Sequence, residues 1–305
     1  MTAATPRTVE QYLDSLRSAL EGADRALVQD ALYDAEEHLR AELAQHPGDN
    51  QGDVLASIVA SYGAPEEVAD AYRSNEKTIQ AALRTPSPRP RTSSVGRFFG
   101  VYSDPRAYLS ILYMLLALVT GTIYFTFAVT GLSMSIGLAI LIIGVPFFLL
   151  FVGATRLVAL AEGRLVETML GTRMPRRPVY PDRDTPFLRR VGDMLKDPRT
   201  WGTLVYFILM LPLGLFYFIF AVVGICFSIA MLVMPILILL YHMGVAGMGH
   251  IQIDGSVELP HPAVLPFISI LGLLLLTVTM HLARGIGYLH GQLAKTLLVQ
   301  AQSSS

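Results

Sequence analysis

Two long stretches of this chain contain no charged side chain, and they limit its fold more than any other feature. They run from Ala107 to Thr155 and from Thr200 to Ile253, and neither holds Asp, Glu, Lys or Arg. Charged residues make up only 15% of the chain, against about 25% in soluble domains. A helix of about 20 apolar residues crosses a bilayer, so each stretch can hold more than one span. We therefore expect an all-α fold, in which a small soluble helical bundle precedes a polytopic α-helical membrane domain.

The charges that the chain does have are unevenly distributed. Residues 1–80 hold six basic and fifteen acidic side chains, a net charge of −9. Residues 81–106 and 156–200 each have a net charge of +4. Short loops rich in Lys and Arg stay on the cytoplasmic side of a membrane. We therefore expect a multi-pass protein of the cytoplasmic (inner) membrane, with its N-terminus in the cytoplasm.

The acidic N-terminal region is predicted to form four short amphipathic helices. Thr8 and Asp24 are suitable N-cap residues for the first two helices. Asp53 and Pro65 mark the expected starts of the third and fourth helices. Gly63 is the expected left-handed stop of the third helix. Together these signals predict a compact bundle.

This acidic bundle, at residues 1–80, is followed by a Pro/Ser/Arg linker and interfacial segment at 81–103. Its negative charge does not suit nucleic acid, because binding to phosphates requires clustered cations. A cytoplasmic protein partner with a basic surface fits better, so we expect a regulator, a kinase or a transporter component as partner, and no direct contact with nucleic acid. The membrane region contacts the lipid bilayer, and the chain can form homo-oligomers.

The membrane region contains an internal repeat. A shift of 93 residues gives fifteen identities over the 33 pairs from 104 to 136, and a shift of 128 residues aligns Arg156 with Arg284. Apolar composition alone does not place Asp, Pro, Arg and Gly in register. Both halves start on the same side, so they are predicted to be parallel repeats. Repeat A occupies 104–196 with a cytoplasmic tail helix, and repeat B occupies 197–305 with an external hairpin loop at 242–262.

Each repeat is expected to cross the membrane and return. Repeat A is predicted as a helix over 107–130, a turn at 131–133, a return over 133–156 and an amphipathic helix near 157–170. Repeat B is predicted as a helix over 203–224, a re-entrant or interfacial segment at 226–241 around Pro235, and a descending helix over 263–283. This arrangement gives four full crossings with both ends inside; the alternative is five crossings with the C-terminus outside.

Two Asp-Pro-Arg motifs lie where the two repeats enter the membrane. In each motif the Asp can cap a helix, the Pro fits its first turn and the Arg can reach the lipid headgroups. This structural explanation is adequate, and a signalling role at the same edge is the alternative. The residues are Asp104, Pro105, Arg106, Asp197, Pro198 and Arg199.

The predicted outer loop contains side chains that could bind zinc or respond to pH. They are His250, Asp254, Glu258 and His261. Their spacing matches no metal motif, and alternating residues around Asp254-Gly255 indicate a β-hairpin. A solvated hairpin is therefore favoured, and no metal ion or other cofactor is expected. The sequence also lacks catalytic motifs, so an enzyme is not expected.

Two stretches of the chain resemble known families. Residues 9–75 resemble the HAAS signalling domain, a small helical module of bacterial membrane proteins. Residues 98–299 are similar to the sensor domain that precedes many actinobacterial histidine kinases. The first resemblance rests on Tyr12-Leu13, Leu16 through Leu20, Asp34-Ala35-Glu36-Glu37-His38 and Tyr62 through Ala69. The second rests on Tyr113, Gly121 through Phe125, Arg156 through Gly171, Asp197 through Trp201 and Leu211 through Gly214.

The resemblance implies a bacterial membrane signalling protein without catalytic residues. HAAS-containing proteins often accompany PadR-like transcription regulators, and the sensor domain normally precedes a kinase. Residues 299–305 leave no room for a kinase module, so the output is expected to pass through a separate cytoplasmic partner. The leading hypothesis is a non-enzymatic sensor or signalling adaptor that responds to an envelope or lipid-phase signal. The alternative is a membrane subunit or scaffold of an exporter complex.

Overall fold

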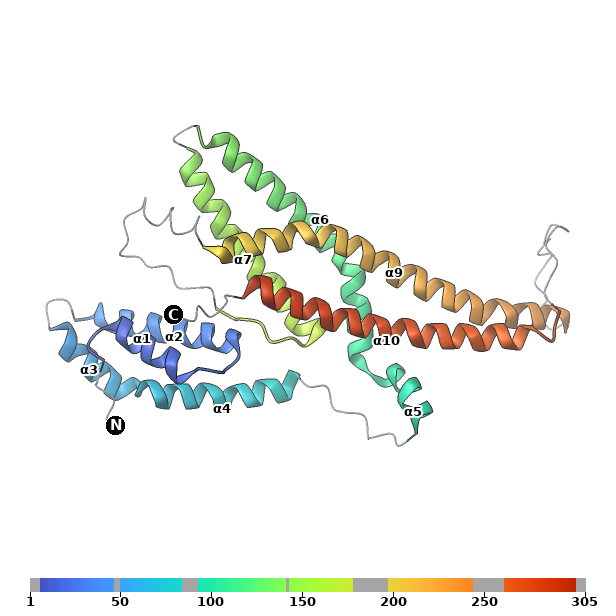
Figure 1. Ribbon diagram of the computed structural model, residues 1–305, viewed down its shortest axis with the longest axis horizontal. Helices are drawn as coiled ribbons and strands as arrows, with labels where there is room; N and C mark the ends of the chain where they lie inside the picture. Colours follow the sequence, from blue (N-terminus) through green and yellow to red (C-terminus); the bar gives the residue numbers. More distant parts are fainter. Residues whose placement is uncertain are drawn as a thin grey trace. The chain divides into compact units, whose positions relative to one another are not determined.

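The computed structural model describes residues 6–46, 50–83, 93–140, 143–177, 197–243 and 261–299 (Figure 1). Every regular element within these ranges is a helix, which confirms the predicted all-α fold. The soluble helices are α1 Val9–Ala19, α2 Arg25–Leu43, α3 Gln51–Tyr62 and α4 Pro65–Leu83. They are followed by α5 Ser94–Phe98, the 3-10 helix η1 Phe99–Ser103, α6 Pro105–Leu138, α7 Gly144–Leu170, α9 Pro198–His242 and α10 Leu265–Leu298.

The chain forms two compact units. The first contains Met1–Arg84, Thr126–Ile208 and His290–Ser305, and the second contains Thr85–Phe125 and Leu209–Leu289. The helices α6, α9 and α10 each contribute residues to both units.

Helices α1–α4 form a bundle around one apolar core. Tyr12, Leu16 and Leu39 are fully buried in it. The Tyr12 hydroxyl donates a hydrogen bond of 3.0 Å to the carbonyl oxygen of Gly63. Gly63 has a φ of +114°, a conformation that a residue without Cβ adopts at little cost. The bundle thus closes through both apolar packing and this turn.

The predicted helix caps of the bundle are largely correct. The Thr8 side chain accepts a hydrogen bond from the Gln11 N–H, and the Asp24 side chain accepts one from the Ala26 N–H. The predicted start of the third helix at Asp53 is wrong. The side chain of Asn50 accepts a hydrogen bond from the Gly52 N–H, so α3 begins earlier.

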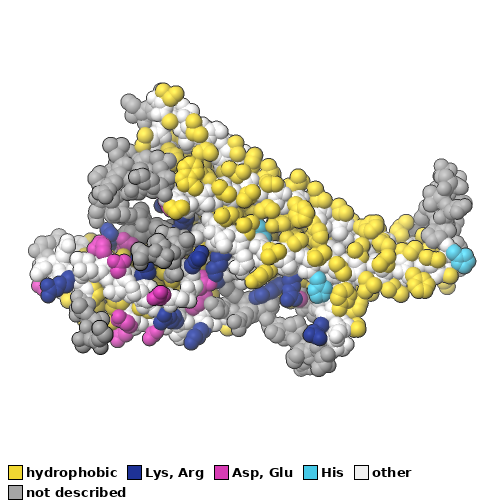
Figure 2. Space-filling model, viewed as in Figure 1, with side chains coloured by type: hydrophobic (Ala, Val, Ile, Leu, Met, Phe, Trp, Pro, Cys, Tyr) yellow, Lys and Arg dark blue, Asp and Glu magenta, His cyan; other side chains and the backbone are white. Residues whose placement is uncertain are grey.

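Among the described residues, four helices are long and apolar enough to cross a membrane: α6, α7, α9 up to Leu240, and α10. Their apolar side chains are mostly not covered by protein, since only 11% of the most apolar window of α9 is buried. On the face drawn in Figure 2, hydrophobic side chains cover α9 and α10, whereas charged side chains gather on α1–α4. An apolar surface of this extent requires lipid, so the chain is a membrane protein.

The first membrane helix is longer than the sequence predicts. We expected a turn at 131–133, but α6 continues through it to Leu138. A Cβ on Gly131 would lie within 2.0 Å of the Phe151 ring. Gly131 therefore permits close packing of α6 on α7 and does not form a turn. The separate helix expected near 157–170 is the end of α7.

The re-entrant segment predicted at 226–241 is also wrong. Helix α9 runs without interruption from Pro198 to His242, with Pro212 and Pro235 inside it. A proline inside a membrane helix is tolerated when neighbouring groups satisfy the freed backbone carbonyl. Since α9 is one helix, the described residues contain four candidate spans without a re-entrant break in α9. The linker core at 84–92 and the predicted outer hairpin at 244–260 lie outside the described residues.

Candidate functional site

The segment after α7 contacts the helical bundle within the first unit. Gly171 ends α7 in the left-handed conformation, with φ +70° and ψ +18°, and its N–H donates to the Glu167 carbonyl oxygen. The chain then leaves the helix axis, and Arg173 becomes almost fully buried, with 7% of its surface exposed. A buried guanidinium must be paired, because an isolated charge is poorly tolerated away from water.

Arg173 is paired with carboxylates from three helices. Its Nη2 lies 3.0 Å from Asp30 Oδ2 on α2, and its Nε lies 3.2 Å from Glu76 Oε2 on α4. Its Nη1 lies 3.4 Å from Glu167 Oε1 on α7. A planar guanidinium with five donors suits such divergent contacts, whereas a lysine ammonium would not reach all three. One side chain thus links α2, α4 and α7.

Asp30 binds the same segment through its backbone. Its Oδ1 accepts hydrogen bonds from the N–H groups of Arg176, at 2.7 Å, and Arg177, at 2.8 Å. Burial raises the pKa of the Asp30 carboxyl, although these two N–H groups and Arg173 oppose the shift. The pKa of Arg173 is raised, because the surrounding carboxylates outweigh its desolvation. Arg173 therefore stays protonated.

Arg177 extends this set of contacts along α2. Its Nε lies 2.9 Å from Asp34 Oδ1, and its guanidinium carbon lies 5.6 Å from the centre of the Tyr33 ring. The Tyr72 hydroxyl of α4 donates to Asp34 Oδ2 at 2.9 Å. Burial and this hydrogen bond both raise the pKa of the Tyr72 hydroxyl. Arg177, Asp34 and Tyr72 line a cavity of about 160 Å³. We call Asp30, Asp34, Glu76, Glu167, Arg173 and Arg177 the charge cluster.

The end of α10 makes a second ionic contact with the bundle. The Lys295 ammonium donates to Asp24 Oδ2, while Asp24 Oδ1 caps the first turn of α2. Both ends, of α7 and of α10, are therefore tied to α2. The Lys295–Asp24 pair is partly buried, with 23% of the lysine side chain and 18% of the aspartate side chain exposed.

A buried polar triad lies in the same unit. The Tyr206 hydroxyl of α9 donates to Glu162 Oε1 of α7 at 2.7 Å and lies 3.0 Å from His290 Nε2 of α10. None of the three side chains is more than 1% exposed. The triad fixes the packing of three long helices through hydrogen bonds.

The two Asp-Pro-Arg motifs form helix entries with equivalent geometry, one in each unit. Asp104 accepts a hydrogen bond from the Arg106 N–H at 3.0 Å, and Asp197 accepts one from the Arg199 N–H at 3.0 Å. The predicted capping is therefore observed. Each Asp also meets an arginine near the end of an apolar run, Arg284 at 2.9 Å and Arg156 at 3.5 Å. A signalling role for these motifs remains a prediction.

The candidate metal residues are not brought together by any described contact. His250, Asp254 and Glu258 lie outside the described residues. His261 is exposed, and its Nδ1 accepts a hydrogen bond from the Ala263 N–H at 3.3 Å. Within the described ranges, no group of three or more His, Cys, Asp or Glu is placed to hold a metal ion.

Sequence reasoning missed the charge cluster and the buried triad. One signal for the cluster was available: Arg173, Arg176 and Arg177 follow directly after the Gly171 helix stop. A signal for the triad was the shift of 128 residues, which aligns Glu162 with His290. Neither pattern identifies the partners, because most of them lie more than forty residues away in the sequence. Glu167, six positions before Arg173, is the exception.

Two protein families match this chain. Residues 113–298 match the model of the Sensor family, described as "Putative sensor". The match covers well over half of the chain. The chain belongs to the Sensor family. Residues 11–71 of this Sensor-family chain match the HAAS model, so both predicted resemblances are confirmed, in the predicted order.

No curated protein and no solved structure matches this Sensor-family chain. The HAAS match covers α1–α3 and the start of α4, and the Sensor match covers most of the four membrane helices. Both are signalling families, not catalytic ones. Together with the apolar helices they fit a role in membrane sensing and signalling.

Proposed function

We propose that this chain is a non-enzymatic signalling adaptor of the bacterial inner membrane. In this proposal, the membrane helices respond to an envelope or lipid-phase signal and the HAAS domain passes the change to a separate cytoplasmic protein. The N-terminus and the charge cluster lie in the cytoplasm. The Lys- and Arg-rich composition of 81–106 and 156–200 supports this orientation.

The observation that carries the proposal is the charge cluster. It joins the HAAS helices α2 and α4 to the segment that directly follows a membrane helix. Signalling requires an element with two states whose balance a ligand can shift. Ion pairs that bridge separate elements suit this role, since a small displacement changes their distances together.

The HAAS domain also retains a surface for a partner. Acidic side chains of α2 and α4 already bind the arginine residues that face them, namely Arg173, Arg176 and Arg177. Other acidic side chains remain exposed, namely Glu10, Asp14, Glu21, Glu37, Asp53, Glu66, Glu67 and Asp70. The chain's own arginines are thus one basic partner of the acidic bundle, and we propose that a cytoplasmic protein binds the remaining exposed acids.

We further propose that the membrane region comprises two parallel repeats, 104–196 and 197–305. Contacts within the second unit support this. A Cβ on Gly121 would approach the Met210 carbonyl oxygen, and a Cβ on Gly214 would approach the Ala117 carbonyl oxygen. Gly214 lies 93 positions after Gly121, and Met210 lies 93 positions after Ala117. A duplicated helix that packs on its own copy gives such reciprocal contacts.

The decisive experiment compares Arg173→Gln with Arg17→Gln in the full chain, reconstituted in lipid. Arg17 is the control, because its side chain is 58% exposed and pairs with Asp14 of the same helix. Loss of Arg173 leaves buried carboxylates unpaired, which costs about 3–5 kcal/mol. We therefore expect hydrogen exchange in α2 and α4 to be faster by about a hundredfold or more. Arg17→Gln should exchange as wild type does.

The same variants separate the adaptor from the exporter alternative. In cells, Arg173→Gln should weaken recovery of the cytoplasmic partner with the tagged protein. Unchanged exchange in α2 and α4 would contradict the coupling. A substrate-efflux defect on deletion of the gene, with residues 1–80 dispensable, would instead support the exporter subunit.

A further inference from the structure

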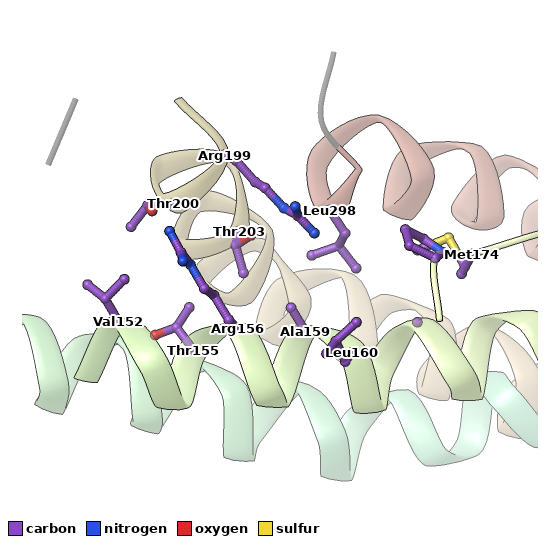
Figure 3. Close-up of a pocket in the computed structure, with 12 residues that line it drawn as sticks. Val152, Thr155, Arg156, Ala159, Leu160, Met174, Arg199, Thr200, Thr203 and Leu298 are labelled. Atoms are coloured by element: carbon purple, nitrogen blue, oxygen red, sulfur yellow. The ribbon is translucent and has the colours of Figure 1, made fainter. Parts of the chain in front are cut away.

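A cleft in the first unit lies between α7 and the first turns of α9 (Figure 3). It encloses about 450 Å³ of space not filled by protein, including its open mouth. Apolar residues such as Val152, Leu160 and Leu298 form part of its wall. Its polar lining consists of Arg156 and Arg199 together with the hydroxyls of Thr155, Thr200 and Thr203. The cleft is therefore apolar in part and cationic in part.

Two polar groups in this cleft are buried without a partner among the described residues. They are the Nη1 of Arg199 and the Oγ1 of Thr200. Thr200 as a whole is only 6% exposed. Buried donors of this kind are rare in folded proteins, and each raises the free energy of the fold unless something binds it. Both belong to the first turn of α9.

The charges that face the cleft are not balanced. Arg156 lies 3.5 Å from Asp197, which also caps the first turn of α9 through the Arg199 N–H. The Arg156 side chain rises from α7 toward Thr200, and the Arg199 side chain extends toward Leu298 (Figure 3). Among the described residues, two cations thus share one carboxylate, so one positive charge has no counter-charge there.

We propose that this cleft binds a phosphate-type oxyanion, held by Arg199 and Arg156 with the Thr200 hydroxyl as a further donor. Guanidinium groups bind phosphate oxygens through charge-assisted hydrogen bonds, which are stronger than neutral ones. One uncompensated positive charge matches one negative charge of a phosphodiester. The ligand is either the headgroup of an anionic phospholipid or a soluble phosphate.

The position of the two arginines along the chain suits the headgroup of a lipid. Arg156 follows the uncharged stretch that ends at Thr155, and Arg199 directly precedes the one that starts at Thr200. Arginines at such boundaries lie at the level of the headgroups, and basic pockets between membrane helices bind anionic headgroups. A role for this cleft in receiving the membrane signal rests on the proposed signalling function. Phosphate binding at the cleft does not depend on that function.

The other repeat provides a matched control. In the second unit, Asp104 and Arg284 form a closer ion pair, at 2.9 Å. Arg106 occupies the position equivalent to Arg199, but it does not line a cleft with an unpaired guanidinium nitrogen among the described residues. Arg106→Gln therefore removes the same charge at an equivalent helix entry without touching the proposed site.

The test measures ligand binding to the purified full chain in detergent by native mass spectrometry. One arm titrates phosphatidylglycerol, a second titrates diacylglycerol, which lacks the phosphate, and a third titrates inorganic phosphate. We expect wild type and Arg106→Gln to bind phosphatidylglycerol or inorganic phosphate with equal affinity. The affinity of Arg199→Gln should be lower by about tenfold or more, because a hydrogen-bonded charge is lost. Diacylglycerol should show no dependence on Arg199.

Binding in the phospholipid arm alone identifies a lipid headgroup, and binding in the phosphate arm identifies a soluble ligand. Should Arg199→Gln fail to fold, Thr200→Val keeps the shape of the side chain and should weaken binding about two- to fivefold. Equal binding by wild type and Arg199→Gln, or an equal loss in Arg106→Gln, would overturn the proposal. Because no partner protein or signalling output is measured, these results are independent of the adaptor function.

Discussion

The helical bundle and the membrane helices place their apolar side chains in opposite ways. In α1–α4 the large apolar residues point inward, and Tyr12, Leu16 and Leu39 are fully buried. In α9 residues such as Ile219 and Phe216 are more than half exposed. The first arrangement is stabilised by removing apolar surface from water, and the second requires lipid in place of water. Within the first unit, ion pairs of Arg173, Arg177 and Lys295 join the bundle to the ends of membrane helices.

An apolar core and an ionic junction respond differently to small displacements. The core resists them, because close-packed side chains lose many contacts at once. The ion pairs of the charge cluster depend on distance and on the surrounding solvent. In the proposed signalling function, this junction is the part of the first unit that shifts between two arrangements.

The largest expected effect concerns the core of the bundle. Leu39→Ala should destabilise the bundle by about 2–5 kcal/mol, because it removes buried methyl groups and leaves a cavity. The control is Ile219→Ala on α9, whose side chain is 51% exposed and loses little packing within the protein. Pulse proteolysis of the full chain in urea gives both values. A loss at Ile219 equal to that at Leu39 would show that the exposed face of α9 packs against protein.

An intermediate effect is expected where membrane helices touch. Gly121→Ala and Gly214→Ala each place a Cβ against a backbone carbonyl, which cannot move aside like a side chain. Overpacking of this kind costs about 1–3 kcal/mol. Both variants should lower the thermal stability in detergent by similar amounts, since the two contacts are reciprocal.

Gly137→Ala is the control for the two glycine variants, because a Cβ there meets nothing within 4 Å. It should leave the melting temperature unchanged or slightly higher, as alanine favours the helix. Clearly unequal effects of the two contact variants would count against reciprocal packing of α6 and α9.

The smallest expected effect concerns the polar edge of the junction. Tyr72→Phe removes the hydroxyl that donates to Asp34 and should weaken the attachment of α4 by about 1–2 kcal/mol. Tyr288→Phe, at a side chain that is 63% exposed, is the control. Hydrogen exchange of α4 in the full chain measures the difference. Equal exchange rates in both variants would show that the Tyr72 hydroxyl does not stabilise the junction.

Features with a local cause could be predicted from the sequence. The uncharged stretches predicted the membrane helices, and Thr8 and Asp24 were identified as caps because capping involves residues two or three positions apart. The helix entries at Asp104 and Asp197 follow the same rule. Such features depend on a few neighbouring residues and not on the rest of the fold.

Features that depend on distant partners could not be predicted. Gly131 suggests a turn in the sequence, and only the Phe151 ring shows that it serves close helix packing. Arg173 finds Asp30 across 143 positions, a pairing that no local pattern specifies. The same holds for the cleft between α7 and α9, in which Arg156 and Arg199 come from different helices.

Asp24 has two tasks, since one carboxylate oxygen caps α2 and the other binds Lys295 at the end of α10. A shift of α10 that withdraws the ammonium frees this carboxylate to reorient, and the first turn of α2 then loses its fixed acceptor. Unwinding at Arg25 and Ala26 would therefore be an early reporter of movement in the membrane. The backbone NMR resonances of these two residues would report this unwinding directly, whatever the stimulus is.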